Sequence, residues 1–171
     1  MPDGVGYRHL YQKMNELNKK KLDMYESGDD LLKLLELGAK IPLVVTGSSM
    51  MPFLKHGKDT VWLIRTDCCR RGQILFFRRR DGSLVLHRIR RIYRDGTMLM
   101  NGDAQNWCEI ITPDQAAAVV CAVTRQGRTR NADNFIWKIR DLLWYPTRPV
   151  RPMLFRLYGK LKQIFRRNGR A

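Results

Sequence analysis

The chain has 171 residues, of which 44% are hydrophobic and 28% are charged. This composition supports one packed domain of ordinary size and excludes a chain that is disordered throughout. Arginine and lysine number 32 against 16 aspartates and glutamates, and the resulting net charge of +16 favours an anionic partner, either nucleic acid or a lipid surface. No apolar run approaches the roughly 18 residues of a membrane-spanning helix, and no signal peptide is visible. We therefore expect a protein that is cytoplasmic or peripheral on the cytoplasmic membrane.

The first 40 residues are polar and then helical. The segment GDDLLKLLELGAK (28–40) begins with Asp29 and Asp30, which can cap a helix, and stops at Gly38. Leucines at 31, 32, 34 and 35 give the predicted helix an apolar face. We therefore predict an N-terminal helical segment over residues 1–40.

Residues 41–124 have the composition of a β domain. Turn sequences separate its apolar segments, and the Asp-Gly pairs at 80–82 and 94–96 are typical of hairpins. Because strands do not alternate with helices, a mostly-β domain is predicted rather than a doubly wound sheet. The predicted strands are rich in β-branched and aromatic residues, and they cover 41–46, 60–65, 73–78, 83–93, 97–101 and 117–123.

Residues 125–171 form a basic, aromatic tail with 13 arginines and lysines against two aspartates. Apolar residues recur at helical spacing on both sides of the predicted linker YPTRPVRP (145–152). Such a tail can lie on an anionic membrane, bind nucleic-acid phosphates, or pack its aromatic residues on the β domain. The stretch 132–167 would make the membrane contact, and nucleic acid is the less favoured partner.

The four cysteines show no spacing typical of a zinc site or a disulfide framework. Cys68 and Cys69 are adjacent, while Cys108 and Cys121 stand apart from them and from each other. We therefore expect thiols in a reducing compartment and no metal or other cofactor.

The segment TGSSMMPFL (46–54) is a candidate catalytic turn. Gly47 permits a tight turn with a positive φ, and Pro52 restrains the chain just beyond it. At such a bend Ser49 can present its hydroxyl as a nucleophile, and nearby backbone N–H groups can bind an anion. The alternative is an ordinary turn, because Gly-Ser turns are common.

A serine nucleophile needs a base, and His87 is the candidate. Strand alternation places His87 on one face with Val85 and Ile89, where a neutral imidazole is either a core residue or a general base. Asp103 follows a predicted strand and could orient the imidazole, unless it only caps its own turn. Glu109 is a second candidate acid for the same role.

Together these segments resemble the signal peptidase I family, whose clan also includes self-cleaving repressors of the SOS type. The resemblance spans about residues 41–124 and rests chiefly on GSSMMP (47–52), LVLHRI (84–89) and NGDAQN (101–106), in that order. It implies a curled, mostly antiparallel β-sheet domain that hydrolyses a peptide bond with a serine nucleophile.

Carried over by position, the resemblance implies that Ser49 is the nucleophile, His87 the base of the Ser-His branch, and Asp103 the acid. Gly47 stands where bacterial relatives often have a hydroxyl, so backbone N–H groups, chiefly that of Ser49, must bind the oxyanion. The membrane anchor typical of a signal peptidase is not seen. The positions that would shape the nucleophile turn and the oxyanion site are Gly47, Ser48, Met50 and Pro52.

The sequence thus predicts a serine endopeptidase that is soluble or peripherally bound to a membrane. Two other functions stay open. A catalytically inactive domain of the same fold could bind peptides or assist maturation, and a nucleic-acid-binding regulator would parallel the repressor branch. The regulator needs a DNA-reading domain, for which the 40 residues before Ile41 are short.

Overall fold

The computed structural model describes residues 28–132, 139, 142–151, 153, 156 and 157. These include helix α2 (Gly28–Glu36), a sheet of eight strands, and the 3₁₀ helices η1 (Pro113–Gln115) and η2 (Tyr145–Val150). The protein is therefore mostly β, as predicted. The strands are β1 (Ile41–Val44), β2 (Asp59–Ile64), β3 (Ile74–Arg78), β4 (Leu84–Ile92), β5 (Met98–Asn101), β6 (Glu109–Ile111), β7 (Ala116–Arg125) and β8 (Arg128–Asn131).

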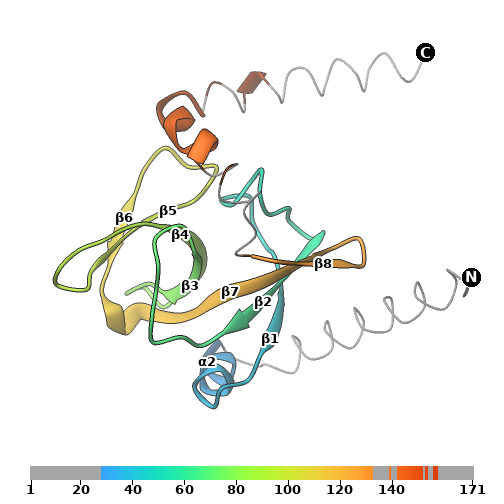
Figure 1. Cartoon of the computed structure of the whole chain (residues 1–171), viewed down its shortest axis with the longest axis vertical. Helices are drawn as coiled ribbons and strands as arrows, with labels where there is room; N and C mark the ends of the chain where they lie inside the picture. Colours follow the sequence, from blue (N-terminus) through green and yellow to red (C-terminus); the bar gives the residue numbers. More distant parts are fainter. Residues whose placement is uncertain (1–27, 133–138, 140–141, 152, 154–155, 158–171) are drawn as a thin grey trace, which may run out of the picture.

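The sheet is antiparallel and follows the order β1-β2-β7-β3-β4-β5-β6, with β8 paired to the end of β7. The long strand β7 joins the two parts of the sheet, because its first half pairs with β3 and its second half with β2. Register irregularities in three of the strand pairs bend the sheet. Figure 1 shows the result, a curled sheet with β1 and β2 on one side and β5 and β6 on the other.

Two apolar clusters hold the sheet in this shape. The first joins the buried face of α2, through Leu31 and Leu35, to Ile74 and Phe76 of β3. The second joins the alternate residues of β3 to β5 and β6. Because successive side chains of a strand point to opposite faces, β3 is buried on both sides and serves both clusters.

The structure confirms the predicted helix and the six predicted strands, each within two residues at its ends. It also confirms both Asp-Gly hairpin turns. Asp81 accepts a hydrogen bond from the N–H of Ser83 at 2.9 Å, and Asp95 accepts one from the N–H of Thr97 at 3.0 Å. Strands β6 and β8 were not predicted, and β8 extends the sheet past residue 124 into the segment interpreted as a tail.

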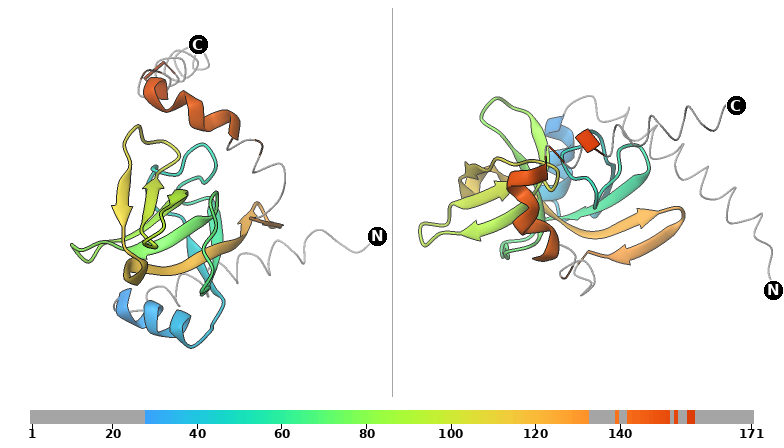
Figure 2. Two further views of the ribbon diagram at one scale, coloured as in Figure 1. Left: turned by 60° about the vertical axis from the view of Figure 1, so that its left-hand side comes forward. Right: turned by 90° about the horizontal axis from the view of Figure 1, so that it is seen from above.

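The interpretation of residues 145–152 as a linker is wrong over its described part. Residues 145–150 form η2, and the next residue, Arg151, is fully buried. Figure 2 shows this segment beside the β5–β6 loop. Most of the predicted tail helices, and residues 1–27, lie outside the described residues, so the membrane contact of 132–167 stays a prediction. Within the described ranges, no helix has both the length and the apolar character to cross a membrane.

Candidate active site

Ser49 lies in the turn that follows β1, between an exposed glycine and the core. Gly47 has a φ of +78°, and its N–H donates to Nδ1 of His56 at 3.0 Å. The carbonyl of Ser48 accepts from the N–H of Met51 at 3.1 Å. Met50 is only 2% exposed and packs in the first apolar cluster, which leaves Ser49 half-buried beside it. Pro52, also half-buried, closes the turn after a cis peptide bond.

The turn presents backbone donors beside the serine hydroxyl. The N–H groups of Ser48, Ser49 and Met50 donate to no acceptor in the part of the chain that the structure describes. Unpaired N–H groups next to a nucleophile can bind the oxyanion that forms during acyl transfer. The turn therefore has backbone N–H groups, unpaired within the described ranges, at the positions where the sequence analysis expects oxyanion donors.

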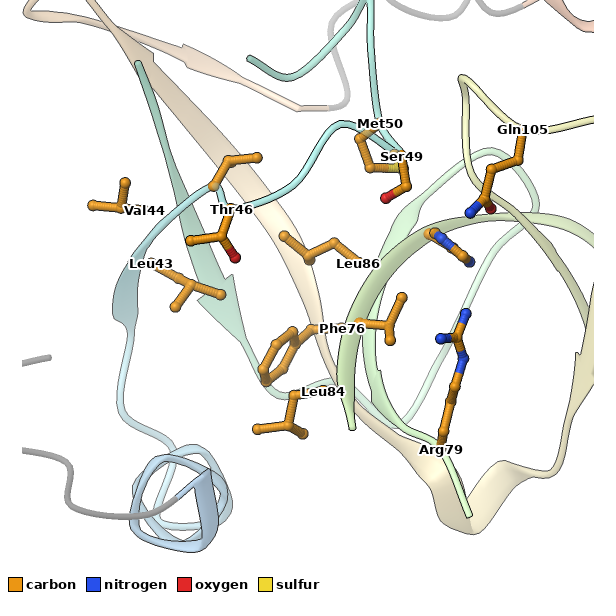
Figure 3. Close-up of a pocket in the computed structure, with 13 residues that line it drawn as sticks. Leu43, Val44, Thr46, Ser49, Met50, Phe76, Arg79, Leu84, Leu86 and Gln105 are labelled. Carbon is orange, nitrogen blue, oxygen red and sulfur yellow. The ribbon is translucent and has the colours of Figure 1, made fainter. Parts of the chain in front are cut away.

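Ser49 and His87 line one pocket of about 250 Å³. Its apolar side is formed by residues of β1, β3 and β4, including Leu43, Phe76 and Leu86. Figure 3 shows the hydroxyl of Ser49, the guanidinium of Arg79 and the amide of Gln105 on the opposite, polar side. The fold therefore brings the predicted nucleophile and the predicted base to the same cavity from different parts of the sheet.

His87 is 1% exposed and packs between the rings of Phe77 and Trp107, with centroid distances of 5.9 and 6.1 Å. Its Nδ1 lies 2.8 Å from Oε1 of Glu109, within ion-pair distance but out of line for a hydrogen bond. Burial lowers the pKa of His87 below its ordinary value of 6.5, against the opposing effect of the Glu109 carboxylate. The imidazole is therefore neutral at pH 7, as a general base must be.

Glu109 reaches His87 because of the strand register. Glu109 pairs with Met100, which pairs with Ile89, two residues from His87 on the same face of β4. Arg79 holds the carboxylate in a fork, with Nε on Oε2 and Nη2 on Oε1, both at 2.7 Å. Burial raises the pKa of Glu109, but the hydrogen bonds from Arg79 and the charges of Arg79 and His87 outweigh burial and lower it. Glu109 is therefore an ionised partner for the imidazole.

Asp103, the expected acid, is engaged elsewhere. It is fully buried and accepts hydrogen bonds from Nε of Arg88 at 3.0 Å and from Nη2 of Arg88 and Arg90 at 2.7 and 2.8 Å. Alternation along β4 points these arginines to the face opposite His87. No hydrogen bond or ion pair joins Asp103 to His87 among the described residues. Of the two candidate acids, Glu109 and not Asp103 therefore lies beside His87.

The sequence analysis also missed a buried arginine that supports the site. Arg151 donates from Nη1 to Oδ1 of Asn101 at 3.1 Å and to the carbonyl of Gln105 at 2.6 Å. Its Nη2 donates to the carbonyl of Trp144 at 3.2 Å, and the Trp144 indole donates to the carbonyl of Asp103. The C-terminal segment thus holds the 101–107 loop. In the sequence, the aromatic residues that precede Arg151 were the feature that could have indicated packing of this segment against the β domain.

The lowered pKa of His87 predicts the pH dependence of a reaction in which it acts as base. We expect the acid limb of kcat/KM to lie below pH 6.5, because the buried imidazole stays neutral there. The unfolded chain binds this proton near pH 6.5 and the folded chain only at lower pH, so acidification through this window destabilises the fold. A pH–rate profile with its acid limb above 6.5 would contradict this assignment.

No cluster of three or more His, Cys, Asp or Glu side chains that could hold a metal ion occurs among the described residues. All four cysteines are free thiols. Comparison of the chain with protein-family models, with curated proteins and with solved structures finds no match.

Proposed function

We propose that the protein is a serine endopeptidase of the signal peptidase type. The observation that supports the proposal best is the shared pocket, in which Ser49 on a turn and a neutral, buried His87 line one cavity. A carboxylate oxygen of Glu109 lies 2.8 Å from Nδ1 of that imidazole. A hydroxyl, a neutral imidazole and a carboxylate in this order are the components of a serine hydrolase.

In the proposed reaction Oγ of Ser49 attacks the scissile carbonyl while His87 takes its proton. The ionised Glu109 stabilises the imidazolium that forms, and the backbone N–H of Ser49 donates to the oxyanion. His87 then returns the proton to the leaving amine, which breaks the C–N bond and leaves an acyl-enzyme. Water, deprotonated by His87, hydrolyses the ester and restores Ser49.

Two open strand edges beside the pocket suit an extended peptide. Among the described residues β1 pairs only with β2, and residues 84–87 of β4 pair only with β3. Leu43 and Val44 from β1 and Leu84 and Leu86 from β4 line the pocket. A peptide can add to such an edge through backbone hydrogen bonds and place an apolar side chain in the pocket. A polypeptide substrate is therefore favoured over a small ester.

A fluorophosphonate probe tests the nucleophile. We expect covalent labelling of the wild-type protein at Ser49, with labelling lost in Ser49→Ala and slowed by about 10³-fold or more in His87→Ala. Ser48→Ala is the matched control and should label normally, because Ser48 is the exposed neighbour in the same turn and the substitution keeps its backbone N–H. Labelling that persists in Ser49→Ala, or a wild-type protein that does not label, would contradict the proposal.

One observation favours a second candidate, a peptide-binding domain without catalytic activity. The Ser49 hydroxyl makes no hydrogen bond to His87 or to any other residue in the described ranges. Catalytic hydrogen bonds often tighten only when substrate binds, so the two candidates differ in what happens once a peptide is bound. Saturable peptide binding to wild-type protein that shows neither cleavage nor labelling would favour the binding domain.

A further inference from the structure

Gln105 carries a hydrogen-bond donor into the pocket that the fold itself does not use. Its side chain lines the pocket together with Ser49 and His87. Oε1 is buried and has no hydrogen-bond partner among the described residues, while Nε2 donates to none of them and faces the pocket (Figure 3). A side-chain amide that turns its N–H₂ group toward a nucleophile can bind negative charge that develops there.

Close packing against Gly102 places the Gln105 side chain beside the nucleophile turn. A Cβ on Gly102 would lie 2.4 Å from Oε1 of Gln105, 2.8 Å from its Cδ and 2.8 Å from the carbonyl oxygen of Ser49. The amide of Gln105 and the nucleophile turn therefore meet over the bare Cα of a glycine. This contact sets where the amide lies relative to Ser49.

The backbone of Gln105 is held from three directions. Its N–H donates to the carbonyl of Gly102 at 2.9 Å, and its carbonyl accepts from Arg151 at 2.6 Å and from Nδ2 of Asn101 at 3.2 Å. The adjacent N–H of Ala104 donates to the carbonyl of Ser49 at 2.7 Å. These bonds tie the loop to the nucleophile turn, so the donor is in place before substrate binds.

We infer that Gln105 is a catalytic residue whose Nε2–H donates to the oxyanion formed when Ser49 attacks. This role rests on the proposed peptidase function. It supplies a side-chain donor that Gly47 cannot provide, in addition to the backbone N–H of Ser49. Arg79, the other strong donor in the pocket, has its Nε and Nη2 bound to Glu109. No proton is transferred by Gln105, which contributes only a preorganised dipole.

The test compares Gln105→Ala and Gln105→Glu with wild-type protein and with Asn106→Ala. Loss of one oxyanion donor is expected to lower kcat by about 10²–10³-fold with little change in KM. The affinity for a peptidyl boronate, which forms a tetrahedral adduct on Ser49, should fall by a similar factor, while that for an uncleaved peptide should not. Asn106 is the exposed neighbour in the loop, and its variant should match wild type.

Gln105→Glu separates a donor from an acceptor, because the carboxylate keeps the size and the acceptor oxygens but loses the N–H₂ group. We expect activity as low as that of Gln105→Ala, or lower, at an unchanged thermal midpoint. Retained activity in Gln105→Glu would overturn the donor role, and so would equal loss of boronate and peptide affinity. Absence of fluorophosphonate labelling in wild type would overturn the peptidase itself, whereas equal labelling rates in wild type and Gln105→Ala would overturn only the role of Gln105.

Discussion

Glu109→Gln is expected to lower kcat/KM by about 10³–10⁴-fold while the protein stays folded. The amide keeps the size of the side chain but cannot stabilise the imidazolium that His87 would become during the proposed reaction. The pKa of His87 should fall further, because the Glu109 carboxylate raises it and the Arg79 cation lowers it. The acid limb of the pH–rate profile should therefore move to lower pH, which steady-state kinetics over a pH series would measure.

Asp103→Asn is the informative comparison, since Asp103 was the acid that the family resemblance implied. Its carboxylate contacts Arg88 and Arg90 and not His87. We therefore expect the activity per folded molecule of Asp103→Asn to exceed that of Glu109→Gln by at least about tenfold. The reverse order of activities would return the orienting role to Asp103.

Asp103→Ala is expected to lower the free energy of unfolding by about 3–5 kcal/mol. The substitution removes the carboxylate that the buried guanidinium groups of Arg88 and Arg90 share. The side chains of Arg88 and Arg90 are only 5% and 6% exposed, and that of Asp103 is fully buried. A loss of this size is a large part of the stability of an ordinary domain. Urea unfolding followed by circular dichroism would measure it as a lower midpoint at an unchanged slope.

Asp67→Ala is the control for this stability effect. Asp67 is exposed and has no hydrogen bond or ion pair with the described residues, so its loss should change stability by less than about 0.5 kcal/mol. A loss below about 1 kcal/mol for Asp103→Ala would show that Arg88 and Arg90 find other partners or water once the carboxylate is gone.

The strands could be predicted because their apolar residues are dense and their turns are marked. Residues 74–77 are all apolar, as expected of a strand buried on both faces, and the Asp-Gly turn at 80–82 marks the next hairpin. Strands β6 and β8 lack both signals. β6 has three residues, and β8 is RTRN with every residue exposed, so each is defined by its partner strand and not by its own composition.

Within the candidate site, the pattern selected Ser49 and His87, which line one pocket, but it preferred Asp103 over Glu109, the acid that lies beside His87. Asp103 and Glu109 both follow β5, and the choice depends on register. The strands have a bulge between Ile89 and Arg91, and Met100 pairs with Glu109. This register places Glu109 on the face of the sheet that carries His87, whereas Asp103 contacts the arginines of β4. Register across three strands is a tertiary property, which a single sequence shows poorly.

Gln105 and Arg151 were beyond the reach of local patterns for a related reason. A glutamine in a loop and an arginine among prolines are ordinarily exposed to solvent. Only contacts with residues distant in the sequence bury such side chains. Arg151 is fully buried because four oxygen acceptors from residues 101–105 and 144 surround its guanidinium. Such a site requires the loop and the C-terminal segment to be folded together.

The burial of Arg151 also affects the order in which the candidate site is completed during synthesis of the chain. During translation the strands with Ser49, His87 and Glu109 are made first, and the arginine that fastens the 101–107 loop is added only later. For the proposed peptidase, a nascent chain would hold its nucleophile and base before the loop is secured. Full reactivity would then begin only after Arg151 has emerged from the ribosome and docked against this loop.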